Sequence, residues 1–411
     1  MHEFNYKNGA LFCEDVPISD IVKEYPTPFY LYSHKTIMWH FNRIKEAFKE
    51  VDPLICFSMK SNSNLTICKL LVNAGAGLDI VSGGELFKAL KVGCPPEKIV
   101  YASVGKTEEE VKSAIRKGIL FFNVESLPEL IMINTIAGKL KRKVKVALRI
   151  NPDVKADIHD YITTGTKEKK FGIDFKTAED IFDNTNKYSH VLLKGIHVHI
   201  GSQITDTEPF VASLSKILEF IDSRNINIEW LNIGGGFGIV YNEEKTTTAQ
   251  EFADAIIPLL KGKDFKLILE PGRFIMGNSG ILVCKVIYVK TGSTGKKFAI
   301  VNAGMNDLIR PSLYKAYHDI KTVIYREAGQ TKYDVVGPIC ESGDYLALDR
   351  NLPELVAGEY LAVMSAGAYG FTMASNYNSR PRPAELLVAE NKVEVVRKAE
   401  TYKDLIRGEK Y

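Results

Sequence analysis

The sequence lacks the features of a secreted, membrane-bound or nucleic-acid-binding protein. No apolar run is long enough to cross a bilayer, and residues 1–7 have no apolar core like that of a signal peptide. The 411-residue chain carries a formal net charge of only +3, without a basic excess that would attract nucleic acid or a membrane surface. We therefore expect neither nucleic acid nor a membrane as a partner.

Cysteine pairs with the spacing of metal ligands are also missing. The six cysteines are scattered over positions 13, 56, 68, 94, 284 and 340, and no two form a Cys-x-x-Cys pair. This spacing argues against a disulfide framework or a structural zinc site, and it fits a reducing compartment. We expect a cytoplasmic protein without a metal site. A hydrophobic content of 45% and a charged content of 25% are typical of a globular protein.

Short apolar runs alternate with longer amphipathic stretches over the first two thirds of the chain. The runs expected to be strands are 55–60, 77–82, 99–103, 120–124, 145–151, 194–200, 228–233 and 266–270. Eight strand–helix units over about 240 residues predict an α/β fold of the (β/α)8 TIM-like barrel type. A doubly wound open sheet is the alternative, but it usually has fewer strands and an early glycine-rich turn.

Beyond about residue 280 the pattern changes to apolar runs joined by short turns. These runs are 281–289, 297–301, 333–336, 360–364, 384–389 and 392–397. They predict a C-terminal antiparallel β domain. A strand near residue 11 is expected to join it, because chain ends often lie together. We therefore expect the barrel to span residues 28–278, and residues 1–27 and 279–411 to form the β domain.

Polar residues follow several of the expected barrel strands, whose carboxyl ends meet at one face. Lys60 ends the first strand, the glycine-rich run 234–238 follows the seventh, and Glu270 ends the eighth. A desolvated lysine is a nucleophilic amine, exposed glycine N–H groups cradle phosphate, and a carboxylate keeps a heterocyclic nitrogen protonated. Together they describe a site for pyridoxal 5'-phosphate. Taken singly, they are also explained by a solvated lysine, a flexible turn and an ion pair between Glu270 and Arg273.

Two histidines lie on the sixth expected strand. His197 and His199 are two residues apart, so both side chains face the barrel interior while Val198 packs outward. A lone histidine is more often a satisfied core residue. We expect His199, which is nearer the mouth, to stack on the cofactor ring, and His197 to be structural.

One cysteine lies in a setting that differs from a core position. Cys340 follows Gly337-Pro338 and is close to Glu341 and Asp344, which suits an exposed loop. Free cysteines are usually inert core residues, but a thiol in such a loop is able to deliver a proton.

Three further residues of the second domain are candidates for ligand binding. Arg310 and Tyr314 have the groups to grip a carboxylate, and Tyr369 has a hydroxyl for a phosphate. Solvated or packed side chains are the commoner explanation for each of them.

Taken in order, these motifs resemble those of the fold-type III pyridoxal-phosphate decarboxylases, the Orn/Lys/Arg decarboxylase class-II family. The resemblance extends from Pro28 to about Arg382. Its motifs are 59–62, 79–85, 161–165 with 170–172, 197–203, 234–238, 270–273, 340–342 and 377–380. Ser58 and Ser61 depart from the family, which commonly has alanines beside the cofactor lysine. They are still small and should not disturb the site.

The resemblance implies a role in cofactor binding for each matching residue. Lys60 would hold pyridoxal 5'-phosphate through its amine, Glu270 would keep the ring nitrogen protonated, and His199 would stack on the ring. The residues that would surround the phosphate or nearby substrate groups are Ser202, Gly234, Gly235, Gly236, Gly272, Arg273 and Tyr369.

The resemblance also implies the reaction and the assembly. The expected reaction is loss of carbon dioxide from meso-2,6-diaminopimelate to give L-lysine, with Cys340 returning the proton and with Lys60, Cys340 and His199 as the catalytic residues. The residues that would recognise the substrate are Arg273, Arg310, Tyr314, Glu341 and Tyr369, with Glu341 suited to the distal ammonium. In this family the loop that matches Cys340 enters the neighbouring barrel, so a homodimer with shared active sites is implied.

Other members of the fold type are the nearest alternatives: ornithine, arginine and carboxynorspermidine decarboxylases, and alanine racemase. A racemase would need a tyrosine opposite the lysine, and the loop 340–342 argues against it. Ornithine-type substrates have no distal carboxylate, so Arg310 would lack a partner. The presence of Lys60 and Cys340 disfavours an inactive, regulatory homologue. A phosphate-binding aldolase barrel would leave the second domain unexplained.

Overall fold

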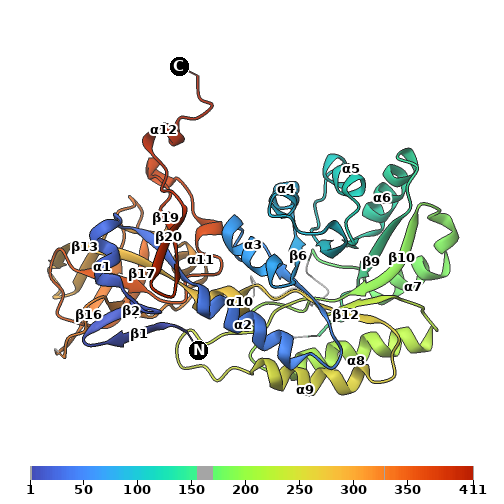
Figure 1. Cartoon of the computed structure of the whole chain (residues 1–411), viewed down its shortest axis with the longest axis horizontal. Helices are drawn as coiled ribbons and strands as arrows, with labels where there is room; N and C mark the ends of the chain where they lie inside the picture. Colours follow the sequence, from blue (N-terminus) through green and yellow to red (C-terminus); the bar gives the residue numbers. More distant parts are fainter. Residues whose placement is uncertain (1, 155–169, 328, 411) are drawn as a thin grey trace. The chain divides into compact units, whose positions relative to one another are not determined.

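The computed structural model describes residues 2–154, 170–327 and 329–410. Two compact units make up the chain (Figure 1). The first consists of Met1–His40, Val240–Glu244 and Ile275–Tyr411, and the second of Phe41–Ile239 and Lys245–Phe274. The sequence assigned residues 28–278 to the barrel, whereas residues 28–40, 240–244 and 275–278 belong to the first unit.

The second unit is built on a closed barrel of eight parallel strands, which confirms the expected barrel. Around the barrel, the order is β10-β11-β12-β5-β6-β7-β8-β9, and β12 pairs with β5 to close it. The strands are β5 (Leu54–Ser58), β6 (Gly77–Ile80), β7 (Ile99–Tyr101), β8 (Phe121–Val124), β9 (Val144–Arg149), β10 (Val191–His197), β11 (Trp230–Asn232) and β12 (Lys266–Leu269).

Helices alternate with the barrel strands along the chain (Figure 1). They are α2 (His34–Ala47), α3 (Leu65–Asn73), α4 (Gly83–Lys91), α5 (Glu108–Lys117), α6 (Leu127–Lys139), α7 (Phe175–Asp183), α8 (Glu208–Ser223), α9 (Ala249–Leu260) and α10 (Arg273–Met276). Helix α5 shows how local sequence sets these elements. Thr107 and Glu110 form a capping box at its start, and Gly118 ends it with a left-handed φ of 71°.

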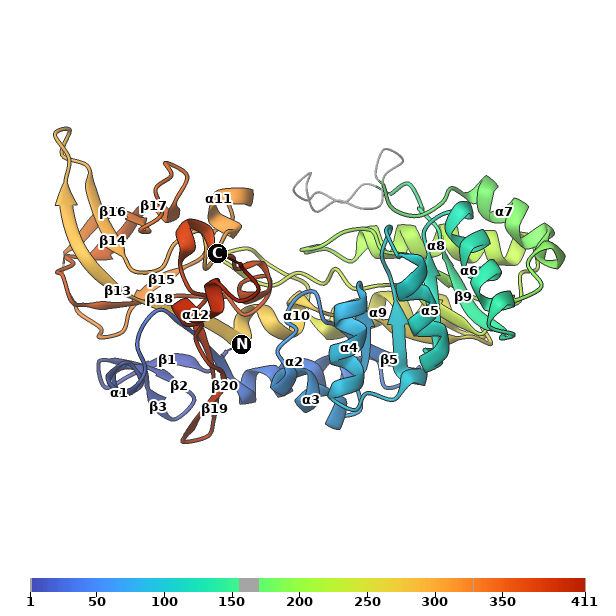
Figure 2. The same cartoon turned by 90° about the horizontal axis from the view of Figure 1, so that it is seen from above.

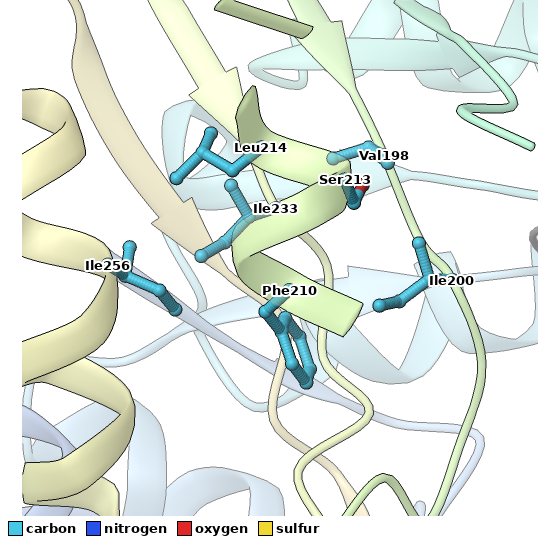
Figure 3. A pocket seen from close by; sticks show the side chains of 7 residues that line it. All are labelled: Val198, Ile200, Phe210, Ser213, Leu214, Ile233 and Ile256. Carbon is cyan, nitrogen blue, oxygen red and sulfur yellow. The ribbon is translucent and has the colours of Figure 1, made fainter. Parts of the chain in front are cut away.

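The side chains of β10 and of the residues just after it alternate between the two faces of the barrel wall. Val198 and Ile200 point outward, toward α8 and α9 (Figure 3). There they line a small apolar cavity together with Phe210, Ser213, Leu214, Ile233 and Ile256. The cavity therefore lies outside the barrel wall. His197, one residue before Val198, faces inward, where it meets a carboxylate described below.

The first unit contains two β-sheets. A three-stranded antiparallel sheet joins β1 (Phe4–Lys7), β2 (Ala10–Cys13) and β3 (Val16–Pro17). The other sheet has nine strands, most of which are labelled in Figure 2. Its main path runs through β17 (Tyr345–Pro353), β16 (Gln330–Val336), β14 (Lys297–Val301), β13 (Gly280–Thr291), β4 (Phe29–Ser33), β19 (Ala384–Ala389) and β20 (Lys392–Arg397). Off this path, β18 (Tyr360–Val363) pairs with β13, and β15 (Ile320–Thr322) pairs with β18.

Two details of this unit differ from the arrangement expected from the sequence. Most strand pairs are antiparallel, as expected, but β14–β16 and β4–β19 are parallel. Strand β2 stays in the small sheet, and it reaches the rest of the unit through a bridge between Ala10 and Ile324. The unit also contains α1 (Ile18–Glu24), α11 (Arg310–Tyr314) and α12 (Tyr402–Leu405).

Strand β4 explains why the expected domain boundary is displaced. All five of its residues are buried, and it lies between β13 and β19 in the large sheet. Its continuous apolar pattern is typical of a strand covered on both faces. Such a pattern predicts a central strand but does not indicate which sheet contains it.

A buried glutamate ties three segments of the first unit together. Glu14 is 1% exposed. Its Oε1 accepts hydrogen bonds from Ser33 Oγ at 2.8 Å and from the backbone N–H of Lys35 at 2.7 Å. Its Oε2 accepts from the backbone N–H of Glu390 at 2.7 Å. One carboxylate therefore joins the N-terminal sheet, the start of α2 and the turn between β19 and β20.

We predict that Glu14→Ala lowers the free energy of unfolding by about 2–4 kcal/mol, because it leaves buried donors without an acceptor. Chemical denaturation followed by circular dichroism measures this loss. Asp15→Ala is the matched control, since Asp15 is an exposed neighbour whose pairs with Lys7 and Lys35 lie at the surface. An effect of Glu14→Ala no larger than that of the control would contradict the role of this carboxylate.

Candidate active site

Lys60 lies in a tight turn just beyond the end of β5. Its Nζ is 3.7 Å from Oδ2 of Asp79, and its side chain is 38% exposed, whereas that of Asp79 is fully buried. The lysine is therefore half-buried rather than enclosed. Its amine remains accessible beside a buried carboxylate.

Two small residues close to Lys60 in the chain, Ser58 and Ser61, pack against Gly272. A Cβ on Gly272 would lie 3.0 Å from Ser61 Oγ and 3.1 Å from Ser58 Cβ. Ser58 Oγ donates a hydrogen bond of 2.6 Å to Asp79, and Ser61 Oγ donates one of 2.7 Å to the carbonyl of Ser58. The two serines that depart from the family pattern thus fit the available space. Their hydroxyl groups also hold the Asp79 carboxylate and the backbone carbonyl of Ser58 in place.

Asp79 is a site residue that the sequence did not single out. Burial, and after it the charge of Glu270, raise the pKa of its carboxyl to about 7, although Lys60 and the hydrogen bond from Ser58 oppose this shift. The available signal was an acidic residue inside the buried strand β6, because an acid in such a position needs a partner.

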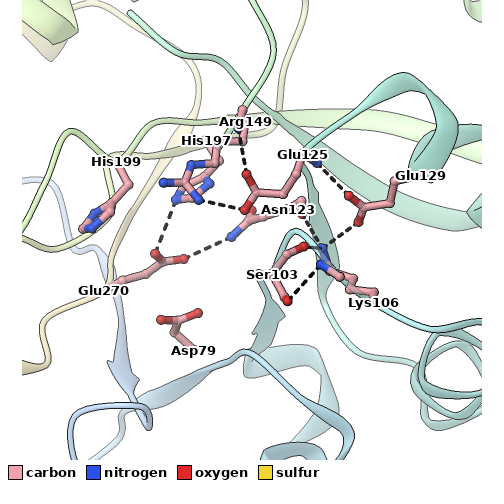
Figure 4. Close-up of polar contacts among 12 residues, drawn as sticks. Asp79, Ser103, Lys106, Asn123, Glu125, Glu129, Arg149, His197, His199 and Glu270 are labelled. Atoms are coloured by element: carbon pink, nitrogen blue, oxygen red, sulfur yellow. Dashed lines mark hydrogen bonds and ion pairs between the residues drawn. The ribbon is translucent and has the colours of Figure 1, made fainter. Parts of the chain in front are cut away.

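Glu270 immediately follows β12 and is held by three side chains inside the barrel, of which Asn123 and His197 are labelled in Figure 4. Its Oε1 accepts hydrogen bonds from Asn123 Nδ2 at 3.1 Å and from Asn232 Nδ2 at 2.6 Å. Its Oε2 is 3.4 Å from Nε2 of His197. Burial favours the neutral acid, but His197, Lys60 and the hydrogen bond from Asn232 outweigh it and lower the pKa of Glu270 below its ordinary value. Glu270 is therefore an ionised acceptor at neutral pH.

The glycine run after β11 is a rigid cradle rather than a flexible turn. Gly234 and Gly236 have φ angles of 70° and 102°, which favour glycine. A Cβ on Gly234 would lie 2.7 Å from His199 Nδ1, and one on Gly235 would overlap the carbonyl oxygen of Glu270. The close packing leaves no room for a side chain at these glycines, and a glycine backbone of this kind fits the binding of a phosphate.

His199 follows β10 and lies against this cradle. The backbone N–H of Gly235 donates to its Nδ1 at 3.4 Å, so this nitrogen acts as an acceptor. Burial, followed by the charges of Lys60 and Arg149, holds the pKa of the imidazole well below its ordinary value. A half-buried neutral ring of this kind is suited to stacking on a flat ligand.

Ser202 and Arg273 meet beside the glycine cradle. Arg273 is 6% exposed and begins α10. Its Nη2 and Nε lie 3.0 and 3.3 Å from Ser202 Oγ, to which they donate. A buried guanidinium and a hydroxyl at this position provide donors for an anionic group.

A chain of buried charges supports the site from the side of β7, β8 and β9 (Figure 4). Lys106 donates to Glu129 Oε1 at 2.6 Å and to the carbonyl of Asn123 at 2.8 Å. Arg149 donates to Glu125 at 2.7 Å, and the backbone N–H of Glu125 donates to Glu129 at 2.9 Å. Burial lowers the pKa of Lys106, whereas Glu129 opposes this shift. These residues hold Asn123, which in turn bonds Glu270.

In the first unit, Arg310 is buried and oriented by two ring systems. It is the first residue of α11 and is 6% exposed. Its Nη1 lies 2.9 Å from His318 Nε2, and its guanidinium lies 4.9 Å from the centroid of the Tyr241 ring. Tyr314 ends the same helix. Arg310 is therefore not a solvated arginine.

Cys340 is the exposed cysteine of the chain, whereas the other five are buried. Its loop is held by side chains of the same unit. The backbone N–H of Cys340 donates to Asn378 Oδ1 at 2.8 Å, and Tyr377 Oη donates to Glu341 Oε2 at 2.8 Å. Asp344 accepts from the backbone N–H of Ile339 at 2.6 Å. The loop is thus ordered around an accessible thiol.

The predicted site residues fall into two groups. The barrel brings together Lys60, His199, Ser202, Gly234, Gly235, Gly236, Glu270, Gly272 and Arg273. The first unit carries Arg310, Tyr314, Cys340, Glu341 and Tyr369, of which Tyr369 is half-buried and has a φ of 56°. The motif 161–165 lies outside the described residues.

Asn123 and Asn232 are further site residues that sequence reasoning missed. They occupy buried strand positions, where an amide usually bonds only the backbone or another core group. Their polarity within β8 and β11 was the only available signal.

Within the described part of the chain, no helix is long and apolar enough to cross a membrane. The same residues include no cluster of three or more His, Cys, Asp or Glu side chains arranged to hold a metal ion.

Comparison with known proteins gives consistent matches. Residues 34–277 match the family model for the pyridoxal binding domain of pyridoxal-dependent decarboxylases. The diaminopimelate decarboxylase of Aquifex aeolicus is 49% identical over 401 residues, which cover 97% of this chain and 95% of that protein.

Solved structures are similar over nearly the whole chain. The diaminopimelate decarboxylase of Helicobacter pylori in complex with L-lysine has a TM-score of 0.91 and 42% identity, and the match covers 95% of this chain and 98% of that chain. The enzyme of M. jannaschii in complex with L-lysine has a TM-score of 0.93 and 38% identity, with coverage of 99% and 98%.

We predict that Gly235→Ala destabilises the protein by about 1–3 kcal/mol, because the added methyl group would collide with backbone rather than with a movable side chain. Denaturant unfolding of the apoprotein measures the change. Gly105→Ala is the control, since nothing lies within 4 Å of a Cβ there. Equal stability of the two variants would show that the cradle is not tightly packed.

Proposed function

Because this chain belongs to the pyridoxal-dependent decarboxylase family, we propose that it decarboxylates meso-2,6-diaminopimelate to L-lysine and CO2, the last step of lysine biosynthesis. The observation that carries the proposal is full-length similarity to enzymes named for this substrate, two of them solved with L-lysine. The reaction is that of a carboxy-lyase, and the free cysteines fit action in the cytoplasm.

The barrel residues fit pyridoxal 5'-phosphate, which supplies an electron sink when it is bound. Lys60 holds the cofactor through its accessible amine. Glu270, kept ionised by its neighbours, accepts from the ring nitrogen, and His199 stacks on the ring. The groups assigned to the phosphate and its surroundings are Ser202, Gly234, Gly235, Gly236, Gly272, Arg273 and Tyr369.

The proposed substrate has a second carboxylate and a second ammonium group, and the first unit offers a partner for each. Arg310, buried and oriented by His318 and Tyr241, binds the distal carboxylate together with Tyr314. Glu341, held by Tyr377, binds the distal ammonium. Arg273 and Tyr369 complete the substrate contacts.

Cys340 returns the proton after CO2 leaves. Its thiol is exposed on an ordered loop, so it is available to a substrate rather than packed in a core. We assign this loop to the barrel of a second copy of the chain, which makes the enzyme a homodimer with shared active sites.

A related decarboxylase with another substrate is the second candidate. Lysine, ornithine, arginine and carboxynorspermidine would use the same barrel chemistry. Ornithine-type substrates have no distal carboxylate for the buried Arg310 to bind. An inactive regulatory homologue would not need both an accessible Lys60 amine and an exposed Cys340 thiol.

Release of CO2 by the purified protein with pyridoxal 5'-phosphate tests the proposal. Meso-diaminopimelate is compared with lysine, ornithine, arginine and carboxynorspermidine. We expect release from meso-diaminopimelate, with L-lysine as the product. Release from another compound alone would reassign the substrate, and release from none with the cofactor bound would favour a regulatory protein.

We predict that Lys60→Ala prevents covalent attachment of the cofactor, because its amine is the group that bonds the aldehyde. Borohydride reduction followed by mass spectrometry of the intact chain detects the attachment. Lys69→Ala, an exposed lysine on α3, serves as the control and should be labelled like the unchanged protein. Labelled Lys60→Ala protein would refute the assignment.

We predict that Cys340→Ala leaves the cofactor absorbance spectrum unchanged and lowers kcat by about 100-fold or more, in the range of lost general acid catalysis. Cys340→Ser, which keeps a weaker acid at the same place, is expected to be intermediate. Steady-state assays of CO2 release measure both variants. A kcat near that of the unchanged enzyme would remove Cys340 from the reaction.

A further inference from the structure

We infer that Asn232 is a positioning residue that couples the two ends of the cofactor site, since it hydrogen-bonds both the Glu270 carboxylate and the backbone of the glycine cradle. The inference rests on the proposed binding of pyridoxal 5'-phosphate. It assigns a role to a residue that touches neither end of the ligand directly.

Asn232 is buried at the carboxyl end of β11. It is 0% exposed, and its register partners are His197 on β10 and Ile268 on β12. Residues paired in register point to the same face of a sheet, so Asn232 and His197 project into the barrel at the same level. Both side chains there reach Glu270.

The orientation of the Asn232 amide follows from its neighbours. The backbone N–H of Gly234 can only donate, and it lies 2.9 Å from Asn232 Oδ1. The other end of the amide is therefore the NH2 group, which donates to Glu270 Oε1 at 2.6 Å. Glu270 must accept this bond, and the short distance is typical of a charge-assisted hydrogen bond.

A third bond closes a ring between the carboxylate and the cradle. The backbone N–H of Glu270 donates to the carbonyl oxygen of Gly234 at 2.7 Å. Asn232, Gly234 and Glu270 are thus linked pairwise by hydrogen bonds, and each fixes the other two. If the Glu270 carboxylate, which accepts from the ring nitrogen, is displaced, the displacement is transmitted to the glycine cradle, which binds the phosphate.

Asn123 provides a matched contrast. It donates to the same oxygen of Glu270 at 3.1 Å, but its backbone carbonyl accepts from Lys106, and its Oδ1 has no hydrogen-bond partner among the described residues. Asn123 therefore supports the carboxylate without bonding the glycine cradle. A variant of Asn123 therefore tests support of Glu270 alone. A variant of Asn232 tests the link between Glu270 and the glycine cradle.

The experiment measures the affinity of the apoenzyme for two ligands: inorganic phosphate by calorimetry, and pyridoxal 5'-phosphate by absorbance. Asn123→Ala is expected to weaken pyridoxal 5'-phosphate binding by about 10-fold, the effect of one charge-assisted hydrogen bond, and to leave phosphate affinity unchanged. Asn232→Ala is expected to weaken the binding of both ligands. Melting temperatures of the apoproteins identify any general loss of fold.

Asn232→Asp is the second variant, because it keeps the acceptor for Gly234 and replaces only the donor to Glu270. Phosphate affinity should stay unchanged, while pyridoxal 5'-phosphate binding weakens as pH rises and the introduced carboxyl ionises beside Glu270, which is already ionised. His197, Lys60 and Asp79 also face Glu270 but are present in every protein compared, so the difference from the unchanged enzyme isolates the substitution.

Equal phosphate affinity in Asn232→Ala and Asn123→Ala would overturn the coupling. A loss of pyridoxal 5'-phosphate affinity in Asn232→Asp that does not depend on pH would also overturn it. An unchanged protein that binds neither ligand would instead overturn the proposed function. The two failures are therefore distinguishable.

Discussion

The ionised carboxylate of Glu270 inside the barrel is the constraint on which the rest of the site depends. Burying a charge is costly unless hydrogen bonds and opposite charges compensate it. Here two amides bond one oxygen, and His197 lies 3.4 Å from the other. The polar residues of the barrel interior are therefore best understood as the surroundings that this one carboxylate requires.

Backbone packing sets the second constraint. The cradle after β11 approaches Glu270 and His199 so closely that a Cβ at Gly234 or Gly235 would overlap them. Gly272 packs in the same way against Ser58 and Ser61 beside Lys60. Small residues at these points let the backbone itself form the walls of the site, which keeps its shape independent of side-chain rotamers.

Much of the fold and part of the site were predictable from the sequence. Alternating apolar and amphipathic stretches indicated the eight barrel strands, and the carboxyl ends of parallel strands meet at one face. Strand position alone therefore predicted that Lys60, Glu270 and the glycine run lie together at one face of the barrel. Strand β4 was assigned to the wrong side of the domain boundary, because a continuous apolar run does not reveal which strands lie beside it.

The sequence by itself determined which residues lie at or just beyond the ends of the barrel strands and where glycines occur, since strand periodicity and glycine are local properties. Only the tertiary structure decided that Asp79 faces Lys60, that two amides bond Glu270, and that His318 orients Arg310. These contacts join residues of different elements, several of them far apart in the chain. Their geometry depends on strand register and on packing, which set the partner of each buried polar group and so its charge state.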